Sequence, residues 1–250
     1  MMENDLIKLL SSFEPISLKE MDRVKLMNRV ETKFLFGVDR LMEILEELKE
    51  DYQVVKIDGN MLPTYSSLYF DDSDFFFYNE HHRERTSRYK VRYRTYVDSN
   101  LSFLEVKHKY KGRTNKKRIK VEGVYDNMPP LHRDFLKEMQ VPKSDLHAVM
   151  MNQYSRITLV SKHSVERLTL DINLSFKLGE TQKDLKNIVI AELKQERVTR
   201  DSSFYKVVRQ KEMRPYRLSK YCMGIIKLYG QEHIKYNRFK QKLLRLNNYD

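Results

Sequence analysis

Hydrophobic and polar residues alternate along much of the chain, with the period of two that is typical of half-buried strands. The segment RYKVRYRTY at 88–96 shows this most clearly, because a lysine or arginine occupies every second position from Arg88 to Arg94. Successive side chains of a strand point to opposite faces, so these cations share one face. The strands predicted from such patterns are 28–36, 52–58, 64–71, 87–97, 101–110, 115–122, 152–161, 165–176 and 187–194.

Helical spacing interrupts the strands at a few places. Apolar residues at i, i+3, i+4 and i+7 predict a helix over 41–48, and Pro130 occupies a first-turn position of a helix over 130–140. Beyond residue 200 the chain is predicted to be mostly helical, with Ser219 as an N-cap. The last segment, about 232–246, is predicted to be a basic amphipathic helix. We expect a surface helix laid on the sheet, with a membrane or polyanion contact as the alternative.

Many strands with intervening helices predict an α+β fold built on a mostly antiparallel sheet, which can close on itself as a barrel. The 250 residues are enough for a sizeable core. No linker rich in glycine, serine or proline, low-complexity tract or internal repeat divides the chain. Residues 1–250 are therefore expected to form a single domain.

The composition adds one unusual feature, a net charge of +12. It predicts an acidic partner: nucleic acid, an anionic membrane surface or a phosphorylated small molecule. The single cysteine, Cys222, excludes a disulfide within the chain and is compatible with a reducing compartment. The sequence has no run of about 20 apolar residues to predict a transmembrane helix, and its first residues do not resemble a secretory signal. A soluble cytoplasmic protein is expected.

Cations also dominate one face of other predicted strands. The polar sets are Arg29, Glu31 and Lys33; Glu105, Lys107 and Lys109; Lys116, Arg118 and Lys120; and Arg167, Thr169 and Asp171, the last set opposite Leu168, Leu170, Ile172, Leu174 and Phe176. A solvated sheet face explains any one of these strands. It explains the set less well, because a solvated face normally mixes charges and directly opposed like charges destabilise a sheet.

The alternative is an inverted barrel, whose charged faces point inward around a polar tunnel and whose apolar faces lie outward beneath helices. Neighbouring cations on one strand are about 7 Å apart. At an effective dielectric constant of about 20, each such pair repels by roughly 2 kcal/mol. An anion with several charges offsets this repulsion, and the oxygens of a phosphate chain suit lysine and arginine donors. The pattern therefore favours a phosphate chain as ligand.

Several short motifs, in order along the chain, resemble one known family. R-V-E-T-K-F at 29–34 resembles the charged first-strand signature of the triphosphate tunnel metalloenzymes, the CYTH-like superfamily. Within it, residues from about 15 to 230 resemble the polyphosphate polymerase branch, the catalytic domain of the vacuolar transporter chaperone (VTC) family. The supporting motifs are SLYFDD (67–72), RYKVRYRTY (88–96), FLEVKHKYKGRTNKKRI (103–119), YSRITL (154–159), RLTLDINL (167–174), VIAELK (189–194) and LSKY (218–221).

The resemblance implies a closed, eight-stranded antiparallel β-barrel with flanking helices. It also implies a metal-dependent polyphosphate polymerase, a phosphotransferase with ATP as the expected donor. The implied phosphate ligands are Lys33, Arg92, Arg94 and Arg156, expected to be catalytic, and Lys107, Lys116, Arg167 and Lys220, expected to bind substrate. Strand parity adds Arg88, Lys90 and Arg118 to the second set. The implied ligand of a divalent metal, Mn²⁺ or Mg²⁺, is Glu192, with Glu31 and Glu105 as further acidic candidates.

Other functions stay open at this point. Hydrolases of the superfamily carry a glutamate where this chain has Arg29, which favours a polymerase over a tunnel-type triphosphatase. A non-catalytic protein that binds polyphosphate or nucleic acid is a further alternative. Carboxylates on the cationic strands oppose nucleic-acid binding, so ATP and polyphosphate are the expected partners, without DNA or RNA. A membrane-associated partner stays open. His81 and His82 lack further metal-ligand spacing and are expected at the surface.

Overall fold

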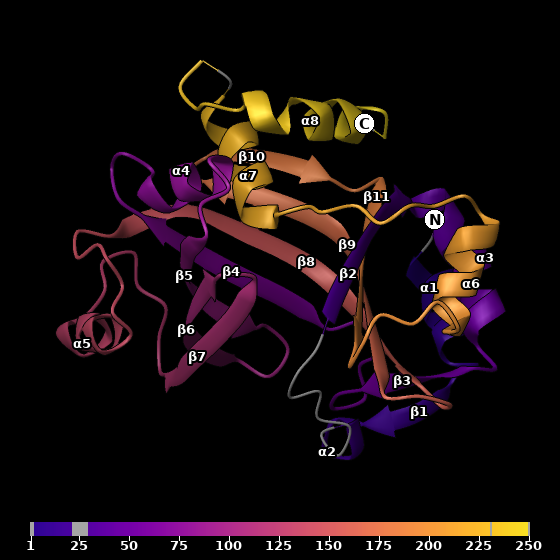
Figure 1. The fold of residues 1–250 in the computed structure, drawn as a ribbon. Coiled ribbons are helices and arrows are strands. Elements are labelled where there is room, and N and C mark those ends of the chain that lie inside the picture. Colours follow the sequence, from indigo (N-terminus) through magenta and orange to yellow (C-terminus); the bar gives the residue numbers. More distant parts are fainter. Residues whose placement is uncertain (1–2, 22–29, 231, 250) are drawn as a thin grey trace.

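The computed structural model describes residues 3–21, 30–230 and 232–249, and one sheet of 11 strands dominates it (Figure 1). The strands are β1 (Glu14–Ser17), β2 (Val30–Gly37), β3 (Tyr52–Lys56), β4 (Thr64–Asp71), β5 (Ser87–Tyr96), β6 (Leu101–Tyr110), β7 (Arg113–Val121), β8 (His147–Ser161), β9 (Glu166–Leu178), β10 (Thr181–Leu185) and β11 (Ile188–Gln195). The helices are α1 (Glu3–Leu10), α2 (Leu18–Met21), α3 (Leu41–Leu48), α4 (Phe76–His82), α5 (Pro130–Glu138), α6 (Ser203–Gln210), α7 (Lys220–Tyr229) and α8 (Lys240–Asn247), with 3-10 turns η1 (Val38–Arg40) and η2 (Asn237–Phe239). The predicted α+β class is confirmed.

Eight strands form the continuous path of the sheet, in the order β2-β11-β9-β8-β4-β5-β6-β7. All neighbours on this path are antiparallel, and the path curls into a half-barrel. The end strands β2 and β7 do not pair within the described residues, so the predicted closure of the barrel is wrong. Both end strands carry cations on their inward faces, such as Lys33 of β2 and Lys116 of β7.

The predicted strands are found in the structure, and two further strands escaped prediction. β1 and β10 are short and mostly exposed, so neither has an apolar face that could reveal it in the sequence. β8 begins at His147 and so is longer than the predicted segment 152–161. β1 and β10 are also only four and five residues long, whereas β7 is mostly exposed too but was predicted from the alternation along its nine residues.

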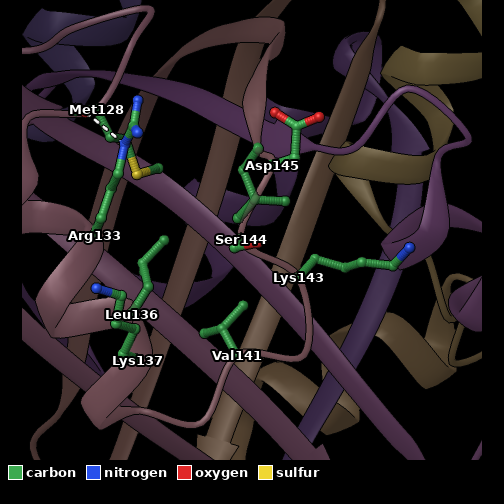
Figure 2. A pocket seen from close by; sticks show the side chains of 9 residues that line it. Met128, Arg133, Leu136, Lys137, Val141, Lys143, Ser144 and Asp145 are labelled. Atoms are coloured by element: carbon green, nitrogen blue, oxygen red, sulfur yellow. Dashed lines mark hydrogen bonds between the residues drawn. The ribbon is translucent and has the colours of Figure 1, made fainter.

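α5 covers the outer face of β4, β5 and β6, where Val91, Leu104 and Phe135 are buried in one cluster. A hollow of about 400 Å³ lies between this helix and the loop that follows it (Figure 2). Apolar Leu136 and charged Lys143 are among the residues that line it. Because it lies on the outer face, this hollow is separate from the inward cations described below.

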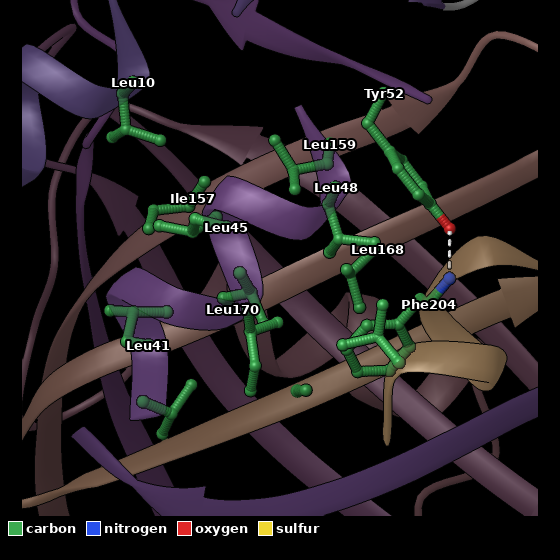
Figure 3. Close-up of a cluster of buried hydrophobic side chains, with 14 of the residues drawn as sticks. Leu10, Leu41, Leu45, Leu48, Tyr52, Ile157, Leu159, Leu168, Leu170 and Phe204 are labelled. Carbon is green, nitrogen blue, oxygen red and sulfur yellow. Dashed lines mark hydrogen bonds between the residues drawn. The ribbon is translucent and has the colours of Figure 1, made fainter. Parts of the chain in front are cut away.

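α1, α3 and α6 cover the outer face at the other side of the sheet (Figures 1 and 3). The predicted spacing of α3 is confirmed, since its four apolar positions are all fully buried: Leu41, Ile44, Leu45 and Leu48. They pack against the outward residues of β8 and β9, such as Ile157 and Leu170. The apolar faces of these strands thus lie on the outside of the half-barrel, beneath helices.

One strand changes its inward face midway. Asn173 in β9 has a φ of 53° and lies beside a register shift in the pairing with β8. The extra residue of such a bulge shifts the alternation by one position. Ile172 therefore packs in the outer cluster with α3, whereas Leu174 and Phe176 pack with α7. The predicted single apolar face from Leu168 to Phe176 is wrong beyond Ile172, because a period-two count cannot detect a bulge.

α7 lies against the concave face, at one end of the half-barrel. Ser219 caps it as predicted, since its Oγ accepts a hydrogen bond from Cys222 N at 3.3 Å. Gly224 approaches the sheet so closely that a Cβ there would lie 2.5 Å from the Phe176 ring. Only glycine allows this approach, so Gly224 fixes how deeply α7 sits.

The basic C-terminal segment forms η2 and α8. Phe239, Leu243 and Leu246 are buried in the same cluster as α7, which confirms the predicted surface helix. The regular helix is shorter than the predicted 232–246, because η2 precedes it. In the described part of the chain, no helix has the length and apolar character needed to cross a bilayer.

Candidate functional site

The cationic row of β5 faces the concave side of the half-barrel. Arg92 lies between Tyr69 of β4 and Glu105 of β6 and donates hydrogen bonds to both side chains. Val91 and Tyr93, its neighbours along the chain, are buried in the outer cluster beneath α5. The inverted sidedness predicted for this strand is therefore confirmed.

Glu105 gathers three of the predicted phosphate ligands. Arg92 donates to its Oε2 through Nε at 2.9 Å and Nη2 at 2.7 Å, while Arg94 Nε lies 3.7 Å away. Lys116 Nζ approaches Oε1 at 2.5 Å from β7. Although burial acts to raise it, Arg92, Arg94 and Lys116 hold the pKa of Glu105 well below its usual range. This carboxylate is ionised and holds the cations in place.

Asp171 forms the second centre, on β9. Arg156 of β8 donates to it through Nε at 2.5 Å and Nη2 at 2.8 Å, and Lys220 of α7 also donates to it. Burial acts to raise the pKa of Asp171, but Arg156 and Lys220 hold it below its usual range. Sequence reasoning assigned Asp171 no role, although its parity with Arg167 placed it on the charged face.

Tyrosine rings lie between cations of the two centres, a role that no sequence pattern indicated. Tyr65 and Tyr154 stack with ring centroids 5.6 Å apart. Arg156 lies 5.1 Å from the Tyr65 centroid and Arg94 5.8 Å from it, while Lys220 Nζ lies 4.5 Å from the Tyr154 centroid. These cation–π contacts position the cations without neutralising them.

The remaining inward charges meet near β2 and β11. Glu192 pairs with Lys33 across the strands and with Lys194 at 2.8 Å. Glu31 Oε2 lies 3.8 Å from Lys107 Nζ, a contact that links β2 to β6 across the open side of the half-barrel. Burial lowers the pKa of Lys33 well below its usual range; Glu31 opposes this shift and nearby lysines add to it.

The other predicted ligands lie around these centres. Lys90 donates to Ser219 Oγ at 2.9 Å, at the start of α7, and Arg88 precedes it on the inward row. Arg118 is exposed and stacks on the Phe103 ring at 4.5 Å. Arg167 Nη1 lies 3.9 Å from Met21 Sδ of α2. Arg118 lies directly opposite Glu105 in the pairing of β6 with β7, although its guanidinium stacks on Phe103.

The adjacent histidines are not both surface residues. His82 is buried, against the prediction, because it packs between Tyr78 and Phe239. His81 is partly buried, and burial, followed by Lys90 and Arg88, lowers its pKa to about 2. Both imidazoles therefore belong to the packing of α4 and do not add charge to the site.

Glu31 and Glu192 are the carboxylates best placed to share a divalent ion. Glu192 lies opposite Lys33, which makes it a diagonal neighbour of Glu31, with Cα atoms about 7–8 Å apart. No group of three acidic, histidine or cysteine side chains that could hold a metal occurs in the described ranges. Mg²⁺ commonly uses one or two carboxylates plus substrate phosphates. The pair therefore fits an ion that arrives with a phosphate chain, whose oxygens can take over the lysines that now pair with these carboxylates.

Solved structures share this fold. One is a candidate adenylyl cyclase from Hippeastrum, described as having a dominant triphosphatase activity; it is 13% identical, with a TM-score of 0.52, and the alignment covers 79% of this chain and 95% of that one. Another is a candidate adenylate cyclase from Bacillus halodurans, 13% identical, with a TM-score of 0.50, covering 77% of this chain and 94% of that one. The chain thus shares the fold of these two proteins.

The family follows from the sequence comparison. The model of the VTC domain matches residues 28–229. The chain belongs to the VTC domain family, and the resemblance seen in the motifs is confirmed. No curated protein gives a significant match. Arg29, whose identity favoured a polymerase, lies outside the described residues.

Proposed function

We propose that this protein is a polyphosphate polymerase, which transfers the γ-phosphate of ATP to a growing inorganic polyphosphate chain. The observation that carries the proposal is the excess of cations on the concave face. Five cations engage the two buried carboxylates Glu105 and Asp171, and further lysines lie beside them. A ligand with several negative charges relieves this excess, and membership of the VTC family supports the same ligand class.

In the proposed reaction, the phosphates of both substrates lie along the concave face. The terminal oxygen of polyphosphate attacks the γ-phosphorus of ATP and forms a new P–O–P link. The bond from the γ-phosphorus to the β–γ bridging oxygen breaks, and ADP leaves with that electron pair. Arg92, Arg94 and Arg156 neutralise the charge on the transferred group. The nucleophile is already anionic, so no proton has to be removed.

A bound divalent ion would supply Lewis-acid stabilisation of phosphate oxygens, and Glu192 with Glu31 would hold it. Lys33 pairs with Glu192 in the protein without ligand. A phosphate oxygen can replace that carboxylate as the partner of Lys33. We therefore assign Lys33 to substrate binding near the metal end of the concave face.

The state of the carboxylates favours a polymerase over a tunnel-type triphosphatase. A hydrolase has to orient a water molecule and accept its proton. Glu105 and Asp171 are poor proton acceptors, because their pKa values are lowered and cations occupy their oxygens. The triphosphatase is the second candidate, because the Hippeastrum protein with a similar fold is described as having that activity.

Incubation of the purified protein with ATP and Mn²⁺ or Mg²⁺, followed by separation of the phosphate species, tests the proposal. We expect a ladder of growing polyphosphate together with ADP. Release of orthophosphate alone would identify a triphosphatase. Neither product, together with tight binding of polyphosphate, would identify a non-catalytic binding protein. A matched reaction with EDTA tests the metal dependence.

The affinity for tripolyphosphate should depend on pH through Lys116. Burial lowers its pKa to about 8 in the protein without ligand, although Glu105 acts in the opposite direction. A bound phosphate stabilises the charged form and raises that pKa, so proton uptake accompanies binding at higher pH. We expect the affinity to fall as the pH rises through about 8, because unbound Lys116 then loses its proton.

Calorimetric titrations between neutral and alkaline pH measure this dependence. Lys116→Arg stays charged throughout, so its uptake of protons on binding should be smaller by up to about one proton. The other buried lysines also titrate, so the affinity of both proteins keeps part of its dependence on pH. An identical dependence of affinity on pH in the two proteins would contradict the role of Lys116.

We also propose that the reaction takes place in the cytoplasm. ATP is the donor in the proposed reaction, and the buried thiol of Cys222 is compatible with a reducing compartment. ATP and inorganic polyphosphate are the proposed partners, without DNA or RNA.

A further inference from the structure

A second concentration of positive charge lies outside the half-barrel, at the end where α4, α7 and α8 meet (Figure 1). Between residues 233 and 249 the chain contains no aspartate or glutamate. We call this region the outer basic surface and define it by Arg83, Lys235, Arg238, Lys240 and Lys242. The first four side chains are exposed, and Lys242 is half-buried.

The outer basic surface is held in place by contacts with α4. Tyr78 Oη donates to the Lys235 carbonyl at 2.7 Å, and Arg238 Nη1 donates to the Arg83 carbonyl at 3.0 Å. Lys242 Nζ lies 5.2 Å from the centroid of the buried Phe239 ring. The backbone that carries these cations is therefore fixed against α4.

This surface and the inward row lie on two sides of α7. Lys90 of the inward row donates to Ser219 Oγ at the start of α7, at 2.9 Å. Phe239 and Leu243, on either side of Lys240 and Lys242, are buried in the same cluster as Ile225 of α7. The two charged regions thus flank the same helix.

The chemistry of α8 favours a polyanion over a bilayer as its partner. A helix that binds a bilayer buries its apolar face among the lipids. Here Leu243 and Leu246 are already buried against the protein, and Leu244 is the one large apolar residue of α8 that is exposed. The side chains of α8 that are accessible to a partner are mostly positively charged, which suits a flexible chain of phosphates.

We propose that the outer basic surface binds the part of a long inorganic polyphosphate chain that extends beyond the concave face. The inference rests on the proposed function for the identity of the ligand. A chain that engages both regions at once binds more tightly than tripolyphosphate, because the second contact is intramolecular. Tripolyphosphate is too short to engage both regions, so its affinity does not depend on the outer surface.

The test compares the affinities of tripolyphosphate and long-chain polyphosphate for Lys235→Gln/Lys240→Gln/Lys242→Gln and for the unchanged protein. We expect the triple variant to bind long chains at least about tenfold more weakly and to bind tripolyphosphate equally well. The salt dependence of long-chain binding should also become shallower, since fewer phosphates are neutralised. The matched control, Lys8→Gln/Lys56→Gln/Lys206→Gln, removes the same charge from exposed sites on α1, β3 and α6.

The outcomes separate this inference from the proposed function. If the unchanged protein does not bind tripolyphosphate, the proposed function is wrong, and the inference about the outer basic surface is overturned with it. If it does bind tripolyphosphate, and the triple variant and the control weaken long-chain binding equally, the affinity depends only on net charge. The inference about the outer basic surface is then overturned. If the triple variant loses binding to vesicles rich in anionic lipid but still binds long-chain polyphosphate as tightly as the unchanged protein, the surface contacts membranes and the inference is overturned.

Discussion

Arg92→Ala is expected to lower polyphosphate synthesis at least about 100-fold while leaving the fold intact. The guanidinium of Arg92 is held by two hydrogen bonds to Glu105 and one to Tyr69, so it is oriented before any substrate binds. A cation that is already oriented needs no reorganisation during the reaction, and it stabilises the negative charge that develops in the transition state. The rate of chain growth at saturating ATP measures the effect, and circular dichroism checks the fold.

Two further variants sharpen this test. Arg92→Lys keeps the charge but loses the planar fork that matches phosphate oxygens, so we expect a smaller but clear loss. Arg209→Ala removes an exposed arginine from α6, on the opposite side of the sheet, and should leave the rate unchanged. Synthesis by Arg92→Ala at the rate of the unchanged protein would remove Arg92 from the site.

Asp171→Asn is expected to destabilise the protein without ligand by about 3–5 kcal/mol. The Asp171 carboxylate is 3% exposed and accepts two hydrogen bonds from Arg156 and one from Lys220. Asparagine keeps the shape but removes the negative charge, so two partly buried cations lose their counter-ion. Urea unfolding of the two proteins, without phosphate in the buffer, measures the difference.

The same variant makes a second, opposite prediction. Tripolyphosphate can take the place of the lost carboxylate, so it should raise the melting temperature of Asp171→Asn more than that of the unchanged protein. Asp184→Asn, at an exposed position on β10, serves as the control and should change neither quantity. A smaller response of Asp171→Asn to tripolyphosphate would show that Arg156 and Lys220 do not meet phosphate.

The alternation of residues was enough to predict most strands and the cationic face of β5. It also placed Lys33 and Arg92 on charged faces, while the family resemblance added Arg156, and the structure brings these residues to the concave side. The pairing of cations with particular carboxylates was not predictable. Arg156 meets Asp171 because β8 and β9 pair in one register, and Lys220 reaches the same carboxylate from a helix 49 positions along the chain.

By itself the sequence determined which side chains share a strand face, because the two-residue period is a local property of an extended backbone. It also identified the family, through motifs that occur along the chain in the family's order. Only the tertiary structure decided that β2 and β7 stay apart, that the bulge at Asn173 turns Leu174 inward, and that α7 carries Lys220 to Asp171. These outcomes depend on pairing and packing between segments distant in the chain, which no local pattern records.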